Sequence, residues 1–114
     1  MASTVVPRFS FIFHAPVAAV DACKAAIFAA GAGRYPSPGS YTECCWSIQG
    51  TGQFRPGATA NPSIGSVGTL EHVEEVRVET ICVGEDVARR AVAALKEAHP
   101  YEEPSYKVIR LEDF

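Results

Sequence analysis

Several features that mark particular classes of protein are missing from this 114-residue chain. Basic residues are not in excess: ten Lys and Arg face 13 Asp and Glu, and the net charge of −3 argues against a large surface for nucleic acid or anionic lipid. No apolar run approaches the roughly 20 residues that span a bilayer. Met1–Pro7 has no Lys or Arg, unlike a secretion leader. These absences predict a cytoplasmic protein that binds neither nucleic acid nor membrane.

Recognisable cysteine and catalytic patterns are also missing. The four cysteines, Cys23, Cys44, Cys45 and Cys82, form no CxxC pair, so they do not predict a zinc site. Each lies in an apolar run, which favours reduced thiols buried in a core over a disulfide or metal role. No Ser/His/Asp or Cys/His grouping is legible, and a nucleophilic Cys44 or Cys45 would need a histidine close in space.

What is present is the composition of one ordinary globular domain. Hydrophobic residues make up 47% of the chain and charged residues 20%. There is no internal repeat, low-complexity segment or linker. We therefore expect a single domain over residues 1–114, with a modest core formed by residues 8–111.

Periodicity divides the chain into six elements. Phe9, Phe11 and Phe13 alternate with polar or mixed residues, as in a strand, whereas Val20, Cys23 and Ile27 recur at helical spacing. The predicted elements are a strand Phe9 to His14, a helix Val17 to Ala30, strands Tyr41 to Gln49 and Leu70 to Val83, a helix from Glu85 to just before Pro100, and a strand Ser105 to Leu111.

The order β-α-β-β-α-β predicts an α+β fold, the ferredoxin-like split βαβ. Right-handed crossovers give a four-stranded antiparallel sheet with two helices on one face. The other face would carry Trp46 or Ile48 together with Ile81 and Ile109, which is too much apolar surface to leave in water. Self-association is therefore expected.

The most unusual stretch is Gly50 to Gly68, GTGQFRPGATANPSIGSVG, within a connection that spans residues 50–69. It holds five of the nine glycines and two prolines. Connections of this length without regular structure are uncommon in compact domains unless they are functional or disordered. Phe54 and Ile64 can anchor it, so we expect an ordered surface loop with a binding role.

Five motifs occur together and in order: GAGRY at Gly31, GTGQFRP at Gly50, ANPSIGSVG at Ala60, EEVRVET at Glu74 and AHPYEEP at Ala98. With them the chain resembles the YqfO-type, CutA-like domain of the NIF3-like family, over about residues 9–111. That domain is known as a module inserted in a larger protein, and its fold is similar to CutA and PII signalling proteins.

The resemblance implies a homo-oligomer, a trimer or a dimer, with a ligand or metal ion in clefts between subunits. It implies no agreed biochemical activity. The two-metal site of larger family members lies in flanking domains, so nothing catalytic is carried over to this chain. Docking with a partner protein, in the manner of the fused relatives, is a further implication.

Candidate ligand-binding residues come mainly from the long loop. Thr51, Gln53, Arg55 and Asn61 offer polar groups there, and Arg34 and Tyr101 from neighbouring motifs complete the set. The amides of residues 50–52 could cradle an anion. Alternatively these glycines only let the chain turn while Phe54 enters the core, and no helix follows to support a phosphate loop.

Candidate metal ligands are His99 and Glu102 in the HPYEEP turn, with Glu79 from the third strand; a divalent ion is the cofactor they would hold. The structural alternative is that His99 compensates the negative end of the second helix and Tyr101 packs.

We therefore expect a non-enzymatic oligomeric module of uncharacterised role that binds a small ligand, metal ion or partner. A small metal-dependent, hydrolase-like enzyme and a structural subunit are the alternatives.

Overall fold

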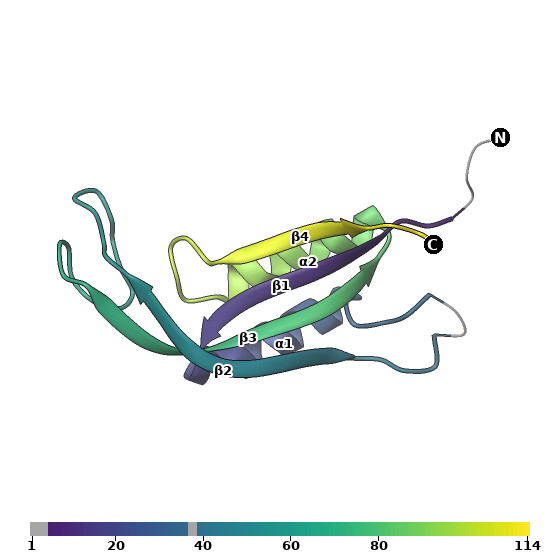
Figure 1. The fold of residues 1–114 in the computed structure, drawn as a ribbon, viewed down its shortest axis with the longest axis horizontal. Helices are drawn as coiled ribbons and strands as arrows, with labels where there is room; N and C mark the ends of the chain where they lie inside the picture. Colours follow the sequence, from purple (N-terminus) through teal and green to yellow (C-terminus); the bar gives the residue numbers. More distant parts are fainter. Residues whose placement is uncertain (1–4, 37–38) are drawn as a thin grey trace.

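The structure, a computed structural model, describes residues 5–36 and 39–114. Residues 1–4 of the Met1–Pro7 segment and residues 37–38 thus lie outside the described residues. The elements, shown in Figure 1, are β1 (Arg8–Pro16), the 3-10 helix η1 (Val17–Ala19), α1 (Val20–Ala29), β2 (Cys45–Phe54), β3 (Glu71–Val83), α2 (Glu85–Ala98) and β4 (Tyr106–Leu111).

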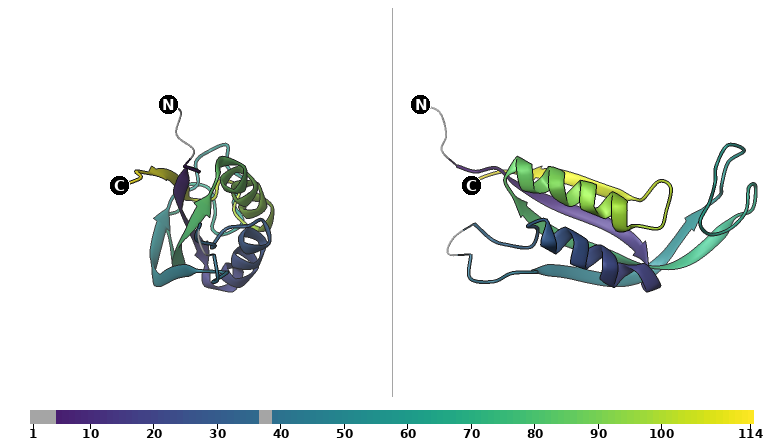
Figure 2. Two further views of the ribbon diagram at one scale, coloured as in Figure 1. Left: turned by 90° about the vertical axis from the view of Figure 1, so that its right-hand side faces the viewer. Right: turned by 180° about the vertical axis from the view of Figure 1, so that it is seen from behind.

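The strands form one sheet in the order β2-β3-β1-β4, and every neighbouring pair is antiparallel. Both helices lie against the same face of this sheet, as Figure 2 shows. A helix follows each central strand and leads to an edge strand, which is the split βαβ connection. The predicted ferredoxin-like α+β fold is confirmed.

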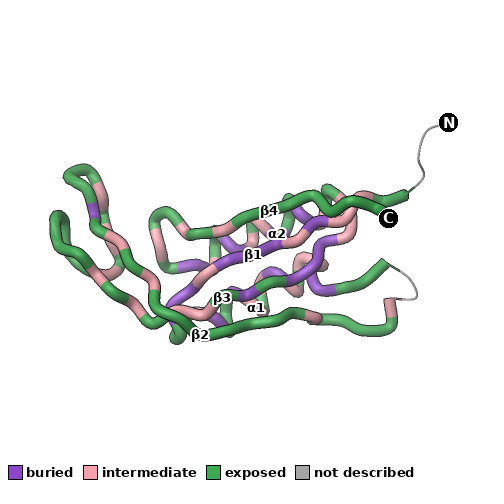
Figure 3. Tube along the Cα trace, in the orientation of Figure 1, coloured by how far each residue is buried: buried purple, intermediate pink, exposed green. Residues whose placement is uncertain are grey.

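The core lies between the sheet and the helices, and Figure 3 shows its buried residues concentrated there. Phe11 and Phe13 point into it from β1 and are fully buried. The helices contribute the apolar stripes that their spacing predicts, Val20, Cys23 and Ile27 from α1 and Ala88, Ala91 and Leu95 from α2. The alanines let the helices approach the sheet closely.

Beyond the helices, the outer halves of β2 and β3 continue as a curved two-stranded arm, defined here as residues 50–75 (Figure 1). Residues 50–54 pair with residues 71–75, so the first part of the predicted loop is strand. β2 also begins at Cys45 rather than Tyr41. Gly50 and Gly52 have low intrinsic strand preference, and the long partner strand β3 overrides it by offering backbone hydrogen-bonding groups.

The sheet face away from the helices is open. Cross-strand register places Trp46 and Ile48 of β2, Ile81 of β3 and Ile109 of β4 on it. Trp46 is 61% exposed and Ile109 47% exposed in the single chain. The apolar surface expected on this face is therefore present, and it comes from both edge strands.

The cysteines divide into two kinds. Cys23 and Cys82 are buried free thiols, as predicted, and burial raises the pKa of the Cys82 thiol to about 11. Cys45 is exposed and Cys44 half-buried, contrary to the core role predicted for them, because no helix covers the start of the edge strand β2. No helix among the described residues is long and apolar enough to cross a membrane.

Candidate functional site

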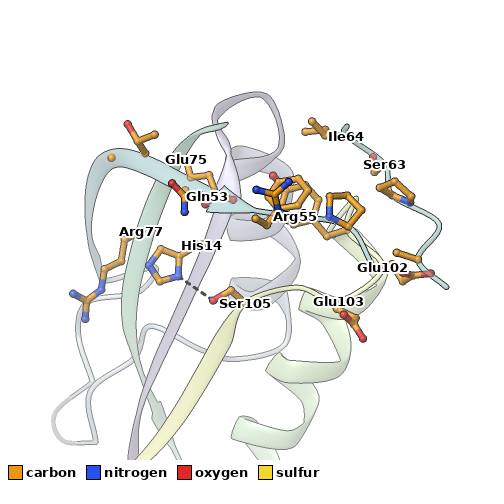
Figure 4. Close-up of a pocket in the computed structure, with 18 of the residues that line it drawn as sticks. His14, Gln53, Arg55, Ser63, Ile64, Glu75, Arg77, Glu102, Glu103 and Ser105 are labelled. Atoms are coloured by element: carbon orange, nitrogen blue, oxygen red, sulfur yellow. Dashed lines mark hydrogen bonds between the residues drawn. The ribbon is translucent and has the colours of Figure 1, made fainter. Parts of the chain in front are cut away.

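A cavity of about 750 Å³, called here the arm cavity, lies where the arm meets the turn between α2 and β4 (residues 99–105). Figure 4 shows side chains from both segments, and from the ends of the central strands, around it. Its lining includes His14, Ile48, Gly50, Thr51, Gly52, Gln53, Phe54, Arg55, Pro62, Ile64, Glu75, Arg77, Tyr101, Glu102, Glu103 and Ser105. Polar and apolar groups thus share one concave surface.

The turn is held by His99, which is only 5% exposed. The helix ends one residue earlier, and the His99 N–H donates to the Leu95 carbonyl at 2.8 Å. The ring Nε2 lies 2.7 Å from the His14 carbonyl, which can only accept, so Nε2 carries the hydrogen. Nδ1 then accepts the Tyr101 N–H at 3.1 Å. Both ring nitrogens are therefore engaged with backbone.

Two contacts join the arm to this turn. The rings of Phe54 and Tyr101 lie 5.9 Å apart, and the Asn61 N–H donates to Glu102 Oε1 at 3.3 Å. The loop at the tip of the arm is closed by Arg55, whose Nη1 donates to the Gly68 carbonyl at 2.7 Å. The loop and the HPYEEP turn thus meet within a single chain, whereas the resemblance placed the binding clefts between subunits.

Glu75 reaches across β2 inside the cavity. Its carboxylate occupies the space above Gly52, where any Cβ would overlap Glu75 Oε1. Beside it lies the Tyr101 hydroxyl, which is buried and makes no hydrogen bond of ordinary geometry to a described residue. Burial, and then the charge of Glu75 and hydrogen bonding to it, raise the pKa of Tyr101 to about 12. The Tyr101 hydroxyl therefore stays protonated at neutral pH. It lies close to the Glu75 carboxylate, although the two groups do not have the geometry of an ordinary hydrogen bond.

His14 lies at the same end of the sheet, and its Nδ1 is 3.4 Å from Ser105 Oγ. Burial lowers the pKa of His14; the charge of Glu75 opposes this effect, while Lys107 and Arg77 reinforce it. The imidazole is therefore neutral at pH 7, and it offers the cavity a polar group without a charge.

The predicted ligand-binding residues separate into three groups. Thr51, Gln53, Arg55 and Tyr101 line the arm cavity. Asn61 borders it through its backbone bond to Glu102. Arg34 lies elsewhere: the preceding Gly33 is hydrogen-bonded to Ile81 and Cys44, at the other end of β3 from Glu75.

The three predicted metal ligands are not gathered. Glu102 lines the cavity, His99 has both nitrogens occupied, and Glu79 forms an ion pair with Arg77, with 3.2 Å between Nη2 and Oε1. Glu79 also lines a second cavity, with Trp46 and Cys45. Within the described ranges, no cluster of three or more His, Cys, Asp or Glu side chains is arranged to hold a metal ion. The divalent-ion prediction thus has no ligand set in the described part of one chain.

The anion cradle considered for residues 50–52 does not form. Gly50, Thr51 and Gly52 belong to β2, in extended backbone with no positive φ at either glycine. The space in front of Gly52 is filled by a carboxylate, which would repel an anion. The glycines instead make room for Glu75.

Sequence reasoning missed His14, Glu75, Arg77 and Ser105 as lining residues. The pairing of β1 with β3 would have found two of them, because it sets His14 opposite Arg77 on the open face. Glu75 lies two residues from Arg77 along β3 and therefore shares that face. Only the antiparallel register, not the local pattern, brings them to one end.

No known family model matches the chain, but individual proteins do. It is 44% identical over 102 residues to a Mycobacterium leprae protein named "GTP cyclohydrolase 1 type 2 homolog", a match that covers 89% of this chain and 25% of the relative. A protein of the same name from Bacillus subtilis is 38% identical over 106 residues, covering 93% and 27%. The chain therefore spans only about a quarter of the curated relatives it matches.

Comparison with solved structures shows a similarity to part of a larger protein as well. A Bacillus cereus protein related to NIF3 superposes with a TM-score of 0.80 at 33% identity, covering 99% of this chain and 28% of that one. CutA1 from Oryza sativa (TM-score 0.59, 16% identity, 98% and 86% covered) and a Bacillus subtilis GlnK–ATP complex (0.54, 12%, 96% and 85%) share the fold. The chain is therefore the counterpart of one CutA/PII-like part of larger proteins of the NIF3/YqfO family.

Proposed function

We propose that this chain is a non-enzymatic, homo-oligomeric, cytoplasmic module that binds a small molecule in the arm cavity. The observation that carries the proposal is the meeting of Thr51, Gln53 and Arg55 with Tyr101 and Glu102 around one cavity. Its volume of about 750 Å³ lies in the range typical of small-molecule sites, and apolar walls with a few convergent polar groups are their usual lining.

Assembly is supported by the open sheet face. Trp46, Ile48 and Ile109 are each about half exposed or more, and they lie on one surface with the largely buried Ile81. An apolar surface shared by both edge strands favours a symmetric contact between copies. The resemblance to CutA and PII proteins points to the same outcome, a trimer or a dimer.

The names of the relatives make a hydrolase the alternative, as a proposal about proteins about four times as long as this chain. A binding role is favoured for this chain because both ring nitrogens of His99 are hydrogen-bonded to backbone groups. His99 is the strongest candidate for a metal ligand or a general base, and neither nitrogen is available for that role. Turnover of GTP by the 114-residue chain, with or without added divalent ions, would favour the enzyme instead.

The test is a thermal-shift screen with divalent metal ions, nucleotides, nucleosides, organic anions and organic cations. Any compound that stabilises the chain is then tested on Gly50→Leu. Gly50 faces the cavity, and an added Cβ there meets nothing within 4 Å, so the leucine should fill the cavity without straining the backbone.

Ser47→Leu is the matched control, since Ser47 is exposed on the same strand but lies outside the cavity lining. We expect binding to be lost in Gly50→Leu and retained in Ser47→Leu. A flat response across the screen, or a compound that binds both variants equally, would count against the arm cavity as the site. A stoichiometric protein partner captured without any small-molecule response would favour the structural-subunit alternative.

A further inference from the structure

The cations of the arm cavity already have partners. Arg55 Nη1 donates to the Gly68 carbonyl at 2.7 Å, and Arg77 lies 3.2 Å from Glu79. Burial lowers the pKa of His14, so this residue adds no charge at neutral pH. Only Arg77 is therefore compensated by a carboxylate. Arg55 keeps its charge, but the part of its guanidinium that holds the loop is not free to bind a phosphate or a carboxylate.

The carboxylates are less well compensated. Glu102 accepts the Asn61 N–H at 3.3 Å. Glu75 forms no ion pair with any residue in the described ranges, although it is half-buried and lines the cavity. A carboxylate withdrawn from water without a cation beside it is costly, and hydrogen bonds from N–H donors would stabilise it. A ligand that donates N–H hydrogen bonds would therefore stabilise Glu75 more than any other group in the cavity.

Its position is fixed from two sides. Gly52 leaves the space in which the carboxylate lies, and the buried Tyr101 hydroxyl faces it as a neutral donor. Tyr101 is itself packed between the rings of His99, at 4.8 Å, and Phe54, at 5.9 Å. The donor is therefore held in place, which restricts the orientations that the carboxylate can adopt before a ligand arrives.

The remaining walls suit a flat molecule. Phe54, Pro56, Pro62, Ile48 and Ile64 supply rings and apolar surface around the polar end. A carboxylate accepts two parallel N–H bonds in one plane, as it does from a guanidinium or from the amide and amino groups of a guanine ring. Single charges such as a metal ion or a simple ammonium would leave the flat walls unused.

We propose that the arm cavity selects a small planar molecule with two adjacent N–H donors, a guanine-type base or a guanidinium compound, and that Glu75 is the group that binds it. This inference rests on the proposed function and narrows its ligand class. It also assigns Tyr101 a role in positioning the Glu75 carboxylate. Phosphate groups on such a ligand contribute less than the donor pair, since Arg77 is paired with Glu79 and Arg55 is anchored to the loop.

The experiment is isothermal titration of the 114-residue chain with guanosine, inosine, adenosine, GTP and methylguanidine. Inosine lacks only the 2-amino group of guanosine, so it tests the paired donors directly. We expect guanosine or methylguanidine to bind, and guanosine to bind more tightly than inosine and adenosine by about tenfold, the order of one charge-assisted hydrogen bond. GTP should gain no more than a few-fold over guanosine at physiological salt. Comparing guanosine with methylguanidine distinguishes the two sources of the donor pair.

Variants then test the assignment. Glu75→Gln keeps the shape but removes the charge and one acceptor, and should weaken guanosine or methylguanidine by about tenfold or more. Tyr101→Phe removes only the hydroxyl that faces Glu75 and keeps the ring that packs on His99 and Phe54, so it should leave the melting temperature close to wild type yet weaken binding several-fold. Glu97→Gln, exposed on α2 and outside the cavity lining, removes the same charge and should change neither property.

Equal affinity of Glu75→Gln and wild type for the bound compound would overturn the proposal, and so would equal binding of guanosine and adenosine or no binding by any donor-pair compound at millimolar concentration. Tyr101→Phe with unchanged affinity would remove the positioning role alone. If the screen finds a ligand without paired donors that is lost in Gly50→Leu, the proposed function stands and this inference fails.

Discussion

The sharpest prediction concerns His99→Ala, because the two interpretations of His99 give opposite results. As the structure has it, the ring donates to the His14 carbonyl and accepts the Tyr101 N–H, and it is 5% exposed. Alanine would leave one acceptor and one donor without their partner, and would remove a ring that packs 4.8 Å from that of Tyr101.

The expected cost follows from these losses. A buried polar group stripped of its partner costs about 1–3 kcal/mol, and two such groups are affected. The vacated ring volume adds to this, since large-to-small changes in packed regions leave a partial cavity. We expect the free energy of unfolding to fall by about 3–5 kcal/mol, a large part of the roughly 5–15 kcal/mol that stabilises a typical domain.

Urea unfolding followed by circular dichroism, in buffer with a chelator, measures this directly. His72→Ala is the control: His72 is exposed and its ring contacts the Gln53 side chain at 2.9 Å, so its loss should cost less than about 0.5 kcal/mol. A His99→Ala chain as stable as wild type in chelator would refute the structural role. If that chain also lost a stabilisation by divalent ions seen in wild type, the metal-ligand interpretation would replace it.

Three further outcomes are expected. Gly52→Ala should displace the Glu75 carboxylate, which is the flexible end of a side chain, and so keep stability within about 1 kcal/mol while lowering affinity for the cavity ligand; a large loss of stability with intact binding would contradict this. His14 has a pKa lowered on folding, so its contribution is complete above pH 6.5 and is lost as the pH falls through the folded value. Between pH 7 and 5, His14→Gln should therefore lose less stability than wild type, by parallel urea titrations; equal losses would refute this. Ile109→Lys on the open face should reduce the oligomer to a monomer in sedimentation and shift Trp46 fluorescence to longer wavelength; an unchanged assembly would exclude this face.

Much of the fold could be predicted from the sequence because its signals are local. The Phe9–Phe11–Phe13 alternation and the alanine-rich helix stripes each follow from one period and one buried face. The arm could not be predicted in the same way. Gly50 and Gly52 argue against a strand locally, and only the backbone of β3 opposite them makes extension favourable.

The candidate site was predicted in part for a similar reason. Thr51, Gln53, Arg55 and Tyr101 lie in segments whose composition already suggested a surface role. Glu75 and His14 lie inside regular strands, where a charged or polar residue is normally assigned to a solvated face. Their role depends on antiparallel register and on the curvature of the arm, and no window of sequence contains either.

The glycines of β2 explain why both the arm and the polar end of the cavity could not be predicted from the sequence. From sequence they could be an anion cradle or simple turn formers, and the structure gives them a third role: Gly52 has no side chain, so the Glu75 carboxylate can cross the strand and face Tyr101. The same absence of a side chain that weakens the strand therefore creates the polar end of the cavity. A site of this kind reverses the charge expected of a glycine-rich loop, because what the glycines expose to a ligand is a carboxylate instead of backbone amides. That is why the ligand class inferred here is an N–H donor and not an anion.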